Sequence, residues 1–216
     1  TDAGFSIVSY TGTGSNGTVA HGLNATPKLI IIKNRDAATS WPVYHSAKGI
    51  GSYGELNDDS DWDTGSASYI FNTAPTSTVF GIGEGTWVNT SSAEYIAYCW
   101  SEVEGYSKIG SYTGNDTDNG VFMYCGFKPA FIMIKNSTTA STEWVIVDNK
   151  RDTDNVVQHI LNSNDDTADD TSTNLLDFLS NGFKLRSGTS RANEGSSNII
   201  VYAAFAESPF KYANAR

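Results

Sequence analysis

The sequence contains only two cysteines, two methionines and three histidines among 216 residues. Two thiols cannot form the dense disulfide network of a small secreted scaffold. Cys99 and Cys125 both lie in apolar, strand-like runs. We therefore expect them to be small buried hydrophobic residues, and neither a disulfide nor metal ligands.

Basic residues are also scarce. Lys and Arg number 14 against 24 Asp and Glu, which gives a formal net charge of −10 and a pI near 4.6. Proteins bind nucleic acid by displacing counterions with basic side chains, so this composition argues against a nucleic-acid partner. No apolar run reaches the about 18 residues of a membrane-spanning helix, and we expect no membrane insertion. A start at Thr1 without Met favours a piece of a longer protein.

Glycine and aromatic residues are abundant, with 20 Gly, 11 Tyr, 10 Phe and 5 Trp, beside many Thr, Ser and Asn. Aromatic residues and Thr suit pleated strands, whereas Gly and Asn suit tight turns. This composition predicts an all-β protein.

Five blocks of sequence occur twice in the same order, at an offset of about 101 to 105 residues. Chance could supply one such match, but five collinear matches indicate that a whole structural unit was duplicated. The paired blocks are 4–12 and 105–114, 27–34 and 129–136, 41–45 and 144–148, 79–82 and 182–185, and 95–102 and 200–207.

The repeat predicts two tandem β-sandwich modules with a jelly-roll-like arrangement, residues 1–104 and 105–216. No Pro-rich or Ser-rich linker separates them, so we expect the modules to pack closely.

Within each module the longest apolar runs, 29–32 and 131–134, are expected to be central strands. The Trp-containing blocks at 41–44 and 144–147 are expected to lie next to them. Residues 174–181 precede a glycine that could end a helix, and we expect one short helical turn there.

Several segments of the second module are distinctive. They are Ser111-Tyr112-Thr113-Gly114, residues 148–152, residues 178–185 and the terminal residues 206–216. Together they resemble an uncharacterised C-terminal domain of tail-fibre-like and other virion proteins of marine bacteriophages, especially those that infect cyanobacteria. The resemblance covers nearly the whole chain and implies a component of the virion surface, outside the host cell, at a host-contacting position. It brings no catalytic or binding residues with it.

Catalytic groups are difficult to find in the sequence. No motif places His21, His45 or His159 beside a nucleophile, so we expect structural or surface roles for all three. Glu102 and Glu207 occupy matching positions after an apolar strand. Facing carboxylates could hydrolyse a glycoside, but these two lie one module apart and are read more simply as residues that pair with a cation or a backbone amide. We expect no enzyme activity and no organic cofactor.

Two acidic runs, at 57–63 and 162–170, occupy roughly equivalent loops. Clustered carboxylates suit Ca²⁺, which takes about 6 to 8 oxygen ligands, although the spacing lacks the Gly and terminal Glu of an EF-hand. Solvated acidic loops are the alternative interpretation. The candidate metal ligands are Asp58, Asp59, Asp61, Asp63, Asp165, Asp166, Asp169 and Asp170.

Two of the five tryptophans, Trp62 and Trp87, lie in polar, loop-like segments. A loop aromatic can stack on the apolar face of a sugar while neighbouring polar groups bind its hydroxyls. These two residues are the candidate glycan contacts. The alternative is that they only hold loops against the sandwich.

The functional hypothesis is a phage virion surface or tail-fibre domain. Its partners would be host-surface carbohydrate or neighbouring virion proteins, and its attachment would be non-catalytic. A purely structural decoration or assembly domain is the first alternative. The chain could also form a homo-oligomer. A glycan depolymerase is the second.

Overall fold

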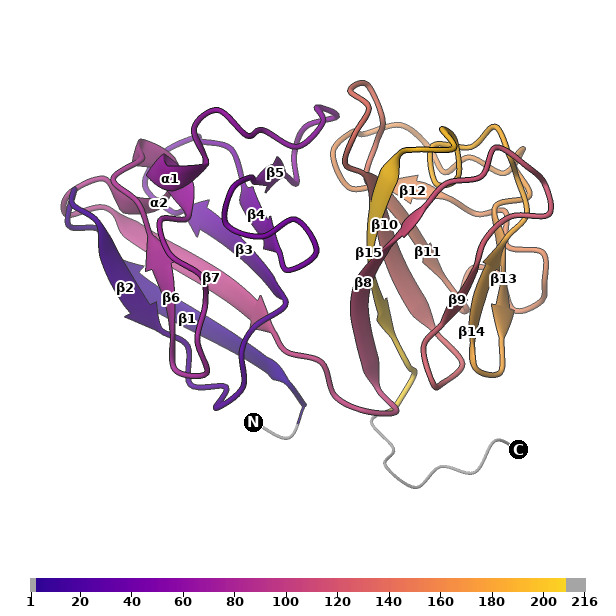
Figure 1. Ribbon diagram of the computed structural model, residues 1–216, viewed down its shortest axis with the longest axis horizontal. Helices are drawn as coiled ribbons and strands as arrows, with labels where there is room; N and C mark the ends of the chain where they lie inside the picture. The colour runs from indigo at the N-terminus through magenta and orange to yellow at the C-terminus, as the bar shows by residue number, and fades with distance from the viewer. Residues whose placement is uncertain (1–2, 209–216) are drawn as a thin grey trace. The chain divides into compact units, whose positions relative to one another are not determined.

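The computed structural model describes residues 3–208 (Figure 1). The terminal motif Pro209–Arg216 lies outside these residues. The chain divides into two compact units, unit 1 (Thr1–Glu102) and unit 2 (Val103–Arg216). Strands are the main regular structure of both, beside two helical turns in unit 1, so the fold is all-β. No helix in the described part of the chain is long and apolar enough to cross a membrane.

Unit 1 has a five-stranded antiparallel sheet, a two-stranded sheet and two helical turns. The larger sheet consists, in spatial order, of β1 (Phe5–Thr11), β7 (Glu94–Trp100), β3 (Leu29–Asn34), β4 (Pro42–His45) and β5 (Gly54–Glu55). The smaller sheet pairs β2 (Gly17–Ala20) with β6 (Val79–Ile82), and the helices are α1 (Ala67–Ile70) and α2 (Thr86–Asn89).

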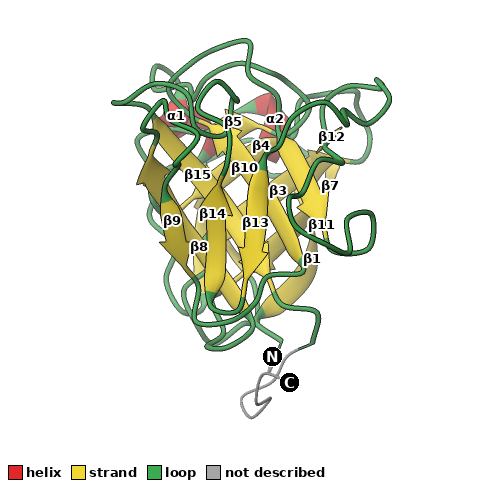
Figure 2. Ribbon diagram, turned by 90° about the vertical axis from the view of Figure 1, so that its right-hand side faces the viewer, coloured by secondary structure: helices red, strands yellow, loops and turns green. Residues whose placement is uncertain are grey.

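Unit 2 has a five-stranded and a three-stranded antiparallel sheet. The larger sheet consists, in spatial order, of β8 (Ser107–Thr113), β15 (Ile199–Phe205), β10 (Phe131–Asn136), β11 (Val145–Asp148) and β12 (Leu161–Asn162). The smaller sheet has the order β13 (Leu176–Leu179), β14 (Gly182–Leu185) and β9 (Phe122–Tyr124), and Figure 2 shows its strands side by side.

The two larger sheets have the same strand order. Each begins with the first strand of its unit, continues with the last strand, and ends with the third, fourth and fifth strands. Strand β13 is an addition in unit 2 and belongs to the smaller sheet. This agreement is what a duplicated unit predicts. The apolar runs at 29–32 and 131–134 are confirmed as central strands, because each pairs with a neighbour on both sides. The Trp-containing blocks are confirmed beside them, as β4 and β11.

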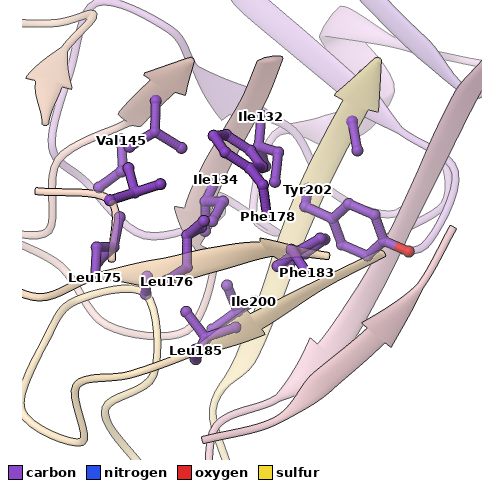
Figure 3. Close-up of a cluster of buried hydrophobic side chains, with 14 of the residues drawn as sticks. Ile132, Ile134, Val145, Leu175, Leu176, Phe178, Phe183, Leu185, Ile200 and Tyr202 are labelled. Atoms are coloured by element: carbon purple, nitrogen blue, oxygen red, sulfur yellow. The ribbon is translucent and has the colours of Figure 1, made fainter. Parts of the chain in front are cut away.

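The core of unit 2 lies between its two sheets, and Figure 3 shows it in close-up. The larger sheet contributes Ile132, Ile134 and Tyr202, and the smaller sheet contributes Phe178 and Phe183. Their side chains are almost completely excluded from water. Burying one such side chain stabilises the fold by about 1.5–3 kcal/mol.

Unit 1 has the same kind of core. Ile30 and Ile32 of β3 pack with Val19 of β2 and Phe80 of β6. Strand periodicity explains the arrangement, since alternate residues of a strand point to the same face of its sheet. Cys99 of this unit and Cys125 of unit 2 are both buried, as the sequence predicted.

The helical turn expected at 174–181 is wrong. Residues 176–179 form strand β13, and a two-residue turn leads directly into β14. The sequence alternates with a period of two there, since Phe178 belongs to the core while Asp177 points to the other face. The turn is fixed by the carbonyl of Asn181, which accepts hydrogen bonds from the amides of Cys125 and Gly126 at 2.9 and 3.2 Å.

Candidate functional site

Strand β9 exposes two large aromatic side chains on one face. Phe122 is 42% exposed and Tyr124 is 64% exposed, whereas Met123 between them packs against the core. Residues two apart on a strand point the same way and lie about 6.8 Å apart. The two rings therefore stand next to each other on the outer face of the smaller sheet of unit 2.

The strand register shows which residues share this face. Phe122 lies opposite Lys184 of β14, which lies opposite Asp177 of β13. Tyr124 lies opposite Gly182, which lies opposite Leu179. We call these six outward residues the aromatic face: Phe122, Tyr124, Asp177, Leu179, Gly182 and Lys184.

Two glycines keep the ring of Tyr124 accessible. Gly182, its cross-strand partner, has no side chain to cover it, and a Cβ there would meet the carbonyl oxygen of Met123 at 1.9 Å. Gly126 lies beside the ring, since a Cβ on Gly126 would be 3.7 Å from the hydroxyl oxygen of Tyr124. Gly126 also has a positive φ of 81°, which L side chains rarely adopt. The exposure of Tyr124 thus follows from backbone constraints on its neighbours.

Two cationic side chains belong to the same side of strand β14, and one of them lies opposite Phe122. Lys184 is half-buried, and its ammonium donates a hydrogen bond of 2.8 Å to the carbonyl of Gly120. Arg186, just beyond β14, forms an ion pair with Asp177 in which its Nε lies 2.6 Å from the carboxylate. Aromatic rings and hydrogen-bonding side chains on one surface suit polar, ring-shaped ligands such as sugars.

Unit 1 presents different residues at the matching positions. In the pair of β2 and β6, Thr18 lies opposite Gly81 and Ala20 lies opposite Val79, while Val19 and Phe80 point into the core. The same register in unit 2 holds Phe122 with Lys184 and Tyr124 with Gly182. Unit 1 therefore has the scaffold of the aromatic face without its aromatic and cationic side chains.

The tryptophans that the sequence selected do not form an exposed site. Trp62 is only 4% exposed, because its ring lies against Gly54, where a Cβ would meet the ring at 2.6 Å. Trp87 is half-buried on the core of unit 1 and makes an edge contact with Tyr53 at 6.0 Å between ring centroids. The predicted glycan contact at Trp62 is therefore corrected, because a sugar cannot stack on a buried ring. Trp87 fits the alternative role of holding a loop.

The acidic runs form loops of the same design in both units. Asp58 accepts a hydrogen bond from the amide of Ser60 at 2.8 Å, and Asp165 accepts one from the amide of Thr167 at 2.8 Å. In each case the hydroxyl of the same residue also donates to the carboxylate. Such local bonds from an Asp to the residue two positions on stabilise turns.

The last aspartate of each run, Asp63 and Asp170, repeats this pattern. The backbone of Asp63 pairs with Tyr53, and that of Asp170 pairs with Ile160. Asp63 then accepts from the amide of Gly65, and Asp170 from the amide of Ser172, both at 2.7 Å. These four carboxylates therefore have a structural role within their own loops.

The remaining candidate ligands are spread along the loops. Asp59 is half-buried, and Asp61, Asp166 and Asp169 are exposed. Within residues 3–208, no three His, Cys, Asp or Glu side chains gather as a metal-binding group. The calcium site stays a prediction.

The histidines occupy unrelated places. The ring of His21 is buried and bonds to the backbone of Leu23 and Thr76 at 3.2 Å each, and His45 is buried and accepts from the amide of Ala47 at 3.2 Å. His159 is partly exposed and contacts Asp152 at 2.8 Å. The hydrogen bond that the ring donates to the Asp152 carboxylate raises the pKa of His159, although burial opposes this shift.

The two repeated glutamates do not lie in one unit. Glu102 ends unit 1, whereas Glu207 belongs to unit 2 and forms an ion pair of 2.5 Å with Lys150. The hydrogen bond from Lys150 lowers the pKa of Glu207. Glu207 thus has the cation partner that the simpler interpretation predicted.

The aromatic face itself was not found from the sequence. The signal was present in the repeat, because Thr18-Val19-Ala20 aligns with Phe122-Met123-Tyr124. Both outward positions change from small to aromatic between the copies. Comparing the copies position by position marks these two residues as changed, whereas their exposure is seen only in the structure.

Comparison with known proteins gives the family of the chain. Neither curated proteins nor solved structures gave a match. One family model matches residues 1–209, which covers both units. The chain belongs to this family, the domain of unknown function DUF7483.

Proposed function

We propose that the chain is a non-catalytic attachment domain that binds host-surface carbohydrate through the aromatic face of unit 2. The observation that carries the proposal is the pair of exposed rings at Phe122 and Tyr124. Strand β9 pairs with β14, so the backbone that carries the rings is fixed before a ligand arrives. Only the side-chain torsions are then left to be ordered on binding, which costs about 0.5–1.5 kcal/mol for each flexible side chain.

The virion setting of this proposal rests on the resemblance of the sequence to domains of phage tail-fibre-like proteins. A rigid strand scaffold suits such a setting, because surface residues can change while the core is kept. Units 1 and 2 differ in this way, because Thr18 and Ala20 of unit 1 correspond to Phe122 and Tyr124 of unit 2 while the core between them stays apolar. Neighbouring virion proteins are the alternative partners, and absence of glycan binding in the test below would favour them.

The test is binding of the purified chain to a broad glycan array and to host-cell envelopes, with and without Ca²⁺. The informative variant is Phe122→Thr combined with Tyr124→Ala, which installs the residues of unit 1 on unit 2. Both positions are exposed, so we expect the variant to fold normally and to lose saturable glycan binding. Tyr69→Ala is the matched control, because Tyr69 of unit 1 is 54% exposed.

Binding that survives in the double variant would place the site elsewhere. No binding of the wild-type chain under any condition would overturn the attachment function and favour a structural role in the virion. A dependence on Ca²⁺ would support the calcium site predicted at the acidic loops.

A further inference from the structure

The aromatic face carries positive charge on a strongly acidic chain. The formal net charge is −10, yet the only carboxylate among the six outward residues, Asp177, is paired with Arg186. Lys184 then leaves the face with a net positive charge. At its matching position unit 1 has Gly81, so this charge accompanies the two aromatic rings.

We infer that the aromatic face binds carbohydrates that carry anionic groups, carboxylate or sulfate. This inference rests on the proposed function and specifies its ligand class. The rings of Phe122 and Tyr124 would stack on the sugar, while Lys184 would bind the anionic substituent.

The strand register places Lys184 beside Phe122. Lys184 and Phe122 are direct cross-strand partners, and side chains in such a pair start about 4.5–5.5 Å apart. A ligand stacked on Phe122 therefore lies within reach of the Lys184 ammonium. The carbonyl of Gly120 takes one of the three ammonium hydrogens and holds the group in place.

Arg186 extends this positive edge. Its side chain is 38% exposed, and its pairing with Asp177, which is 11% exposed, orients the guanidinium. A guanidinium has five N–H donors, so binding Asp177 leaves donors for a ligand. Charge-assisted hydrogen bonds to an anion are about twice as strong as neutral ones. A neutral sugar would use these cations poorly, whereas an anionic sugar would use them fully.

The acidity of the rest of the chain does not exclude an anionic ligand. At physiological salt, exposed charges more than about 8 Å apart are largely screened from each other. A ligand seated on the face is therefore governed by the nearby Lys184 and Arg186.

The experiment compares matched ligand pairs by titration calorimetry with the full chain. An oligogalacturonate is compared with its methyl ester, and a sulfated galactan oligosaccharide with its desulfated form. We expect the anionic member of at least one pair to bind about tenfold or more tightly than its neutral partner. Which pair shows the difference identifies carboxylate or sulfate as the group recognised.

Single-residue variants test whether the preference for anionic oligosaccharides comes from the aromatic face. Lys184→Gln should weaken binding of the anionic oligosaccharide about tenfold and leave binding of the neutral one nearly unchanged. Lys184→Arg should retain most of the preference. Lys150→Gln is the control for a general charge effect, since Lys150 forms an exposed pair with Glu207 on another part of unit 2.

The outcomes separate the two claims. Equal affinity for anionic and neutral partners, lost in Tyr124→Ala, would overturn the anionic ligand and leave the attachment function in place. Absence of binding to all four ligands and to the array would overturn both. A preference that survives in Lys184→Gln would also overturn the assignment to this face.

Discussion

Unit 1 and unit 2 place outward residues at the same register positions of an equivalent strand pair, but they fill these positions differently. Thr18 and Ala20 in unit 1 are replaced by Phe122 and Tyr124 in unit 2. The core positions between them stay apolar, with Val19 in one unit and Met123 in the other. The difference teaches that the buried side of the strand preserves the fold while the outer side is free to change.

The acidic loops of the two units have the same turns but are contacted by different side chains. In unit 1 the loop region is held by an aromatic contact between Tyr53 and Trp87. In unit 2 Arg191 donates a hydrogen bond of 2.7 Å to Asn162. Its charge also lowers the pKa of Asp165 and Asp170, after the larger effect of hydrogen bonds from their own turns. The Tyr53 hydroxyl also donates a hydrogen bond of 3.2 Å to Asp63, so a tyrosine contacts the acidic run of unit 1 where an arginine contacts that of unit 2.

The largest effect should come from the shared core. Phe80 and Phe183 are both 0% exposed at matching positions of β6 and β14. Replacing either by Ala removes its buried contacts and leaves a cavity, which costs about 3–5 kcal/mol. We expect Phe80→Ala to lower protection from hydrogen exchange throughout unit 1, and Phe183→Ala to do so throughout unit 2. Similar losses in both units from either variant would show that the units unfold together and would break the comparison.

A smaller but more selective effect is expected at Gly182. Its counterpart in unit 1 is Val79, so the shared plan alone predicts that valine is tolerated. The structure predicts the opposite, because a Cβ on Gly182 would lie 1.9 Å from the carbonyl oxygen of Met123. Gly182→Val should destabilise unit 2 by about 1–3 kcal/mol, which thermal unfolding can measure. The reverse change, Val79→Gly, is the control, and a neutral Gly182→Val would contradict the close approach of β9 and β14.

The parts of the structure that the sequence predicted correctly depend on periodic signals. The buried strands β3 and β10 are long apolar runs, and the repeat placed β4 and β11 beside them. The strand β13 was missed because Leu175 and Leu176 adjoin each other and the segment ends before a glycine, which imitates the end of a helix. Only the pairing of β13 with β14 decides between the two structures, and pairing is a long-range property.

The site was predicted less well, for a physical reason. Trp62 lies in a polar segment, but sequence polarity does not show that Gly54 leaves room for its ring to be buried. Tyr124 lies in an apolar run, but the run does not show that Gly126 and Gly182 leave its ring uncovered. Exposure of an aromatic side chain depends on its neighbours in space, and a single sequence does not contain that information directly.

The smallest effect, and the sharpest test of the charged loop in unit 2, is its response to acid. The hydroxyl of Thr167 lowers the pKa of Asp165, and the hydroxyl of Ser172 lowers that of Asp170. A carboxyl group with a lowered pKa in the folded state stabilises the fold above its unfolded pKa of about 3.9. This stabilisation is lost as the pH falls through the folded-state pKa.

We therefore expect residues 162–173 to lose hydrogen-exchange protection, corrected for intrinsic rates, on acidification below about pH 4. The acidic loop of unit 1 holds Asp58 and Asp63 in turns of the same kind, but the charge of Arg191 belongs to unit 2, so we expect the unit 1 loop to respond less. Arg191→Gln should reduce the charge that favours the two carboxylates and move the loss of protection to higher pH. High salt should narrow the gap between wild type and Arg191→Gln, since it screens the exposed charges. An equal response of the two loops to acid would show that charge is not what distinguishes them.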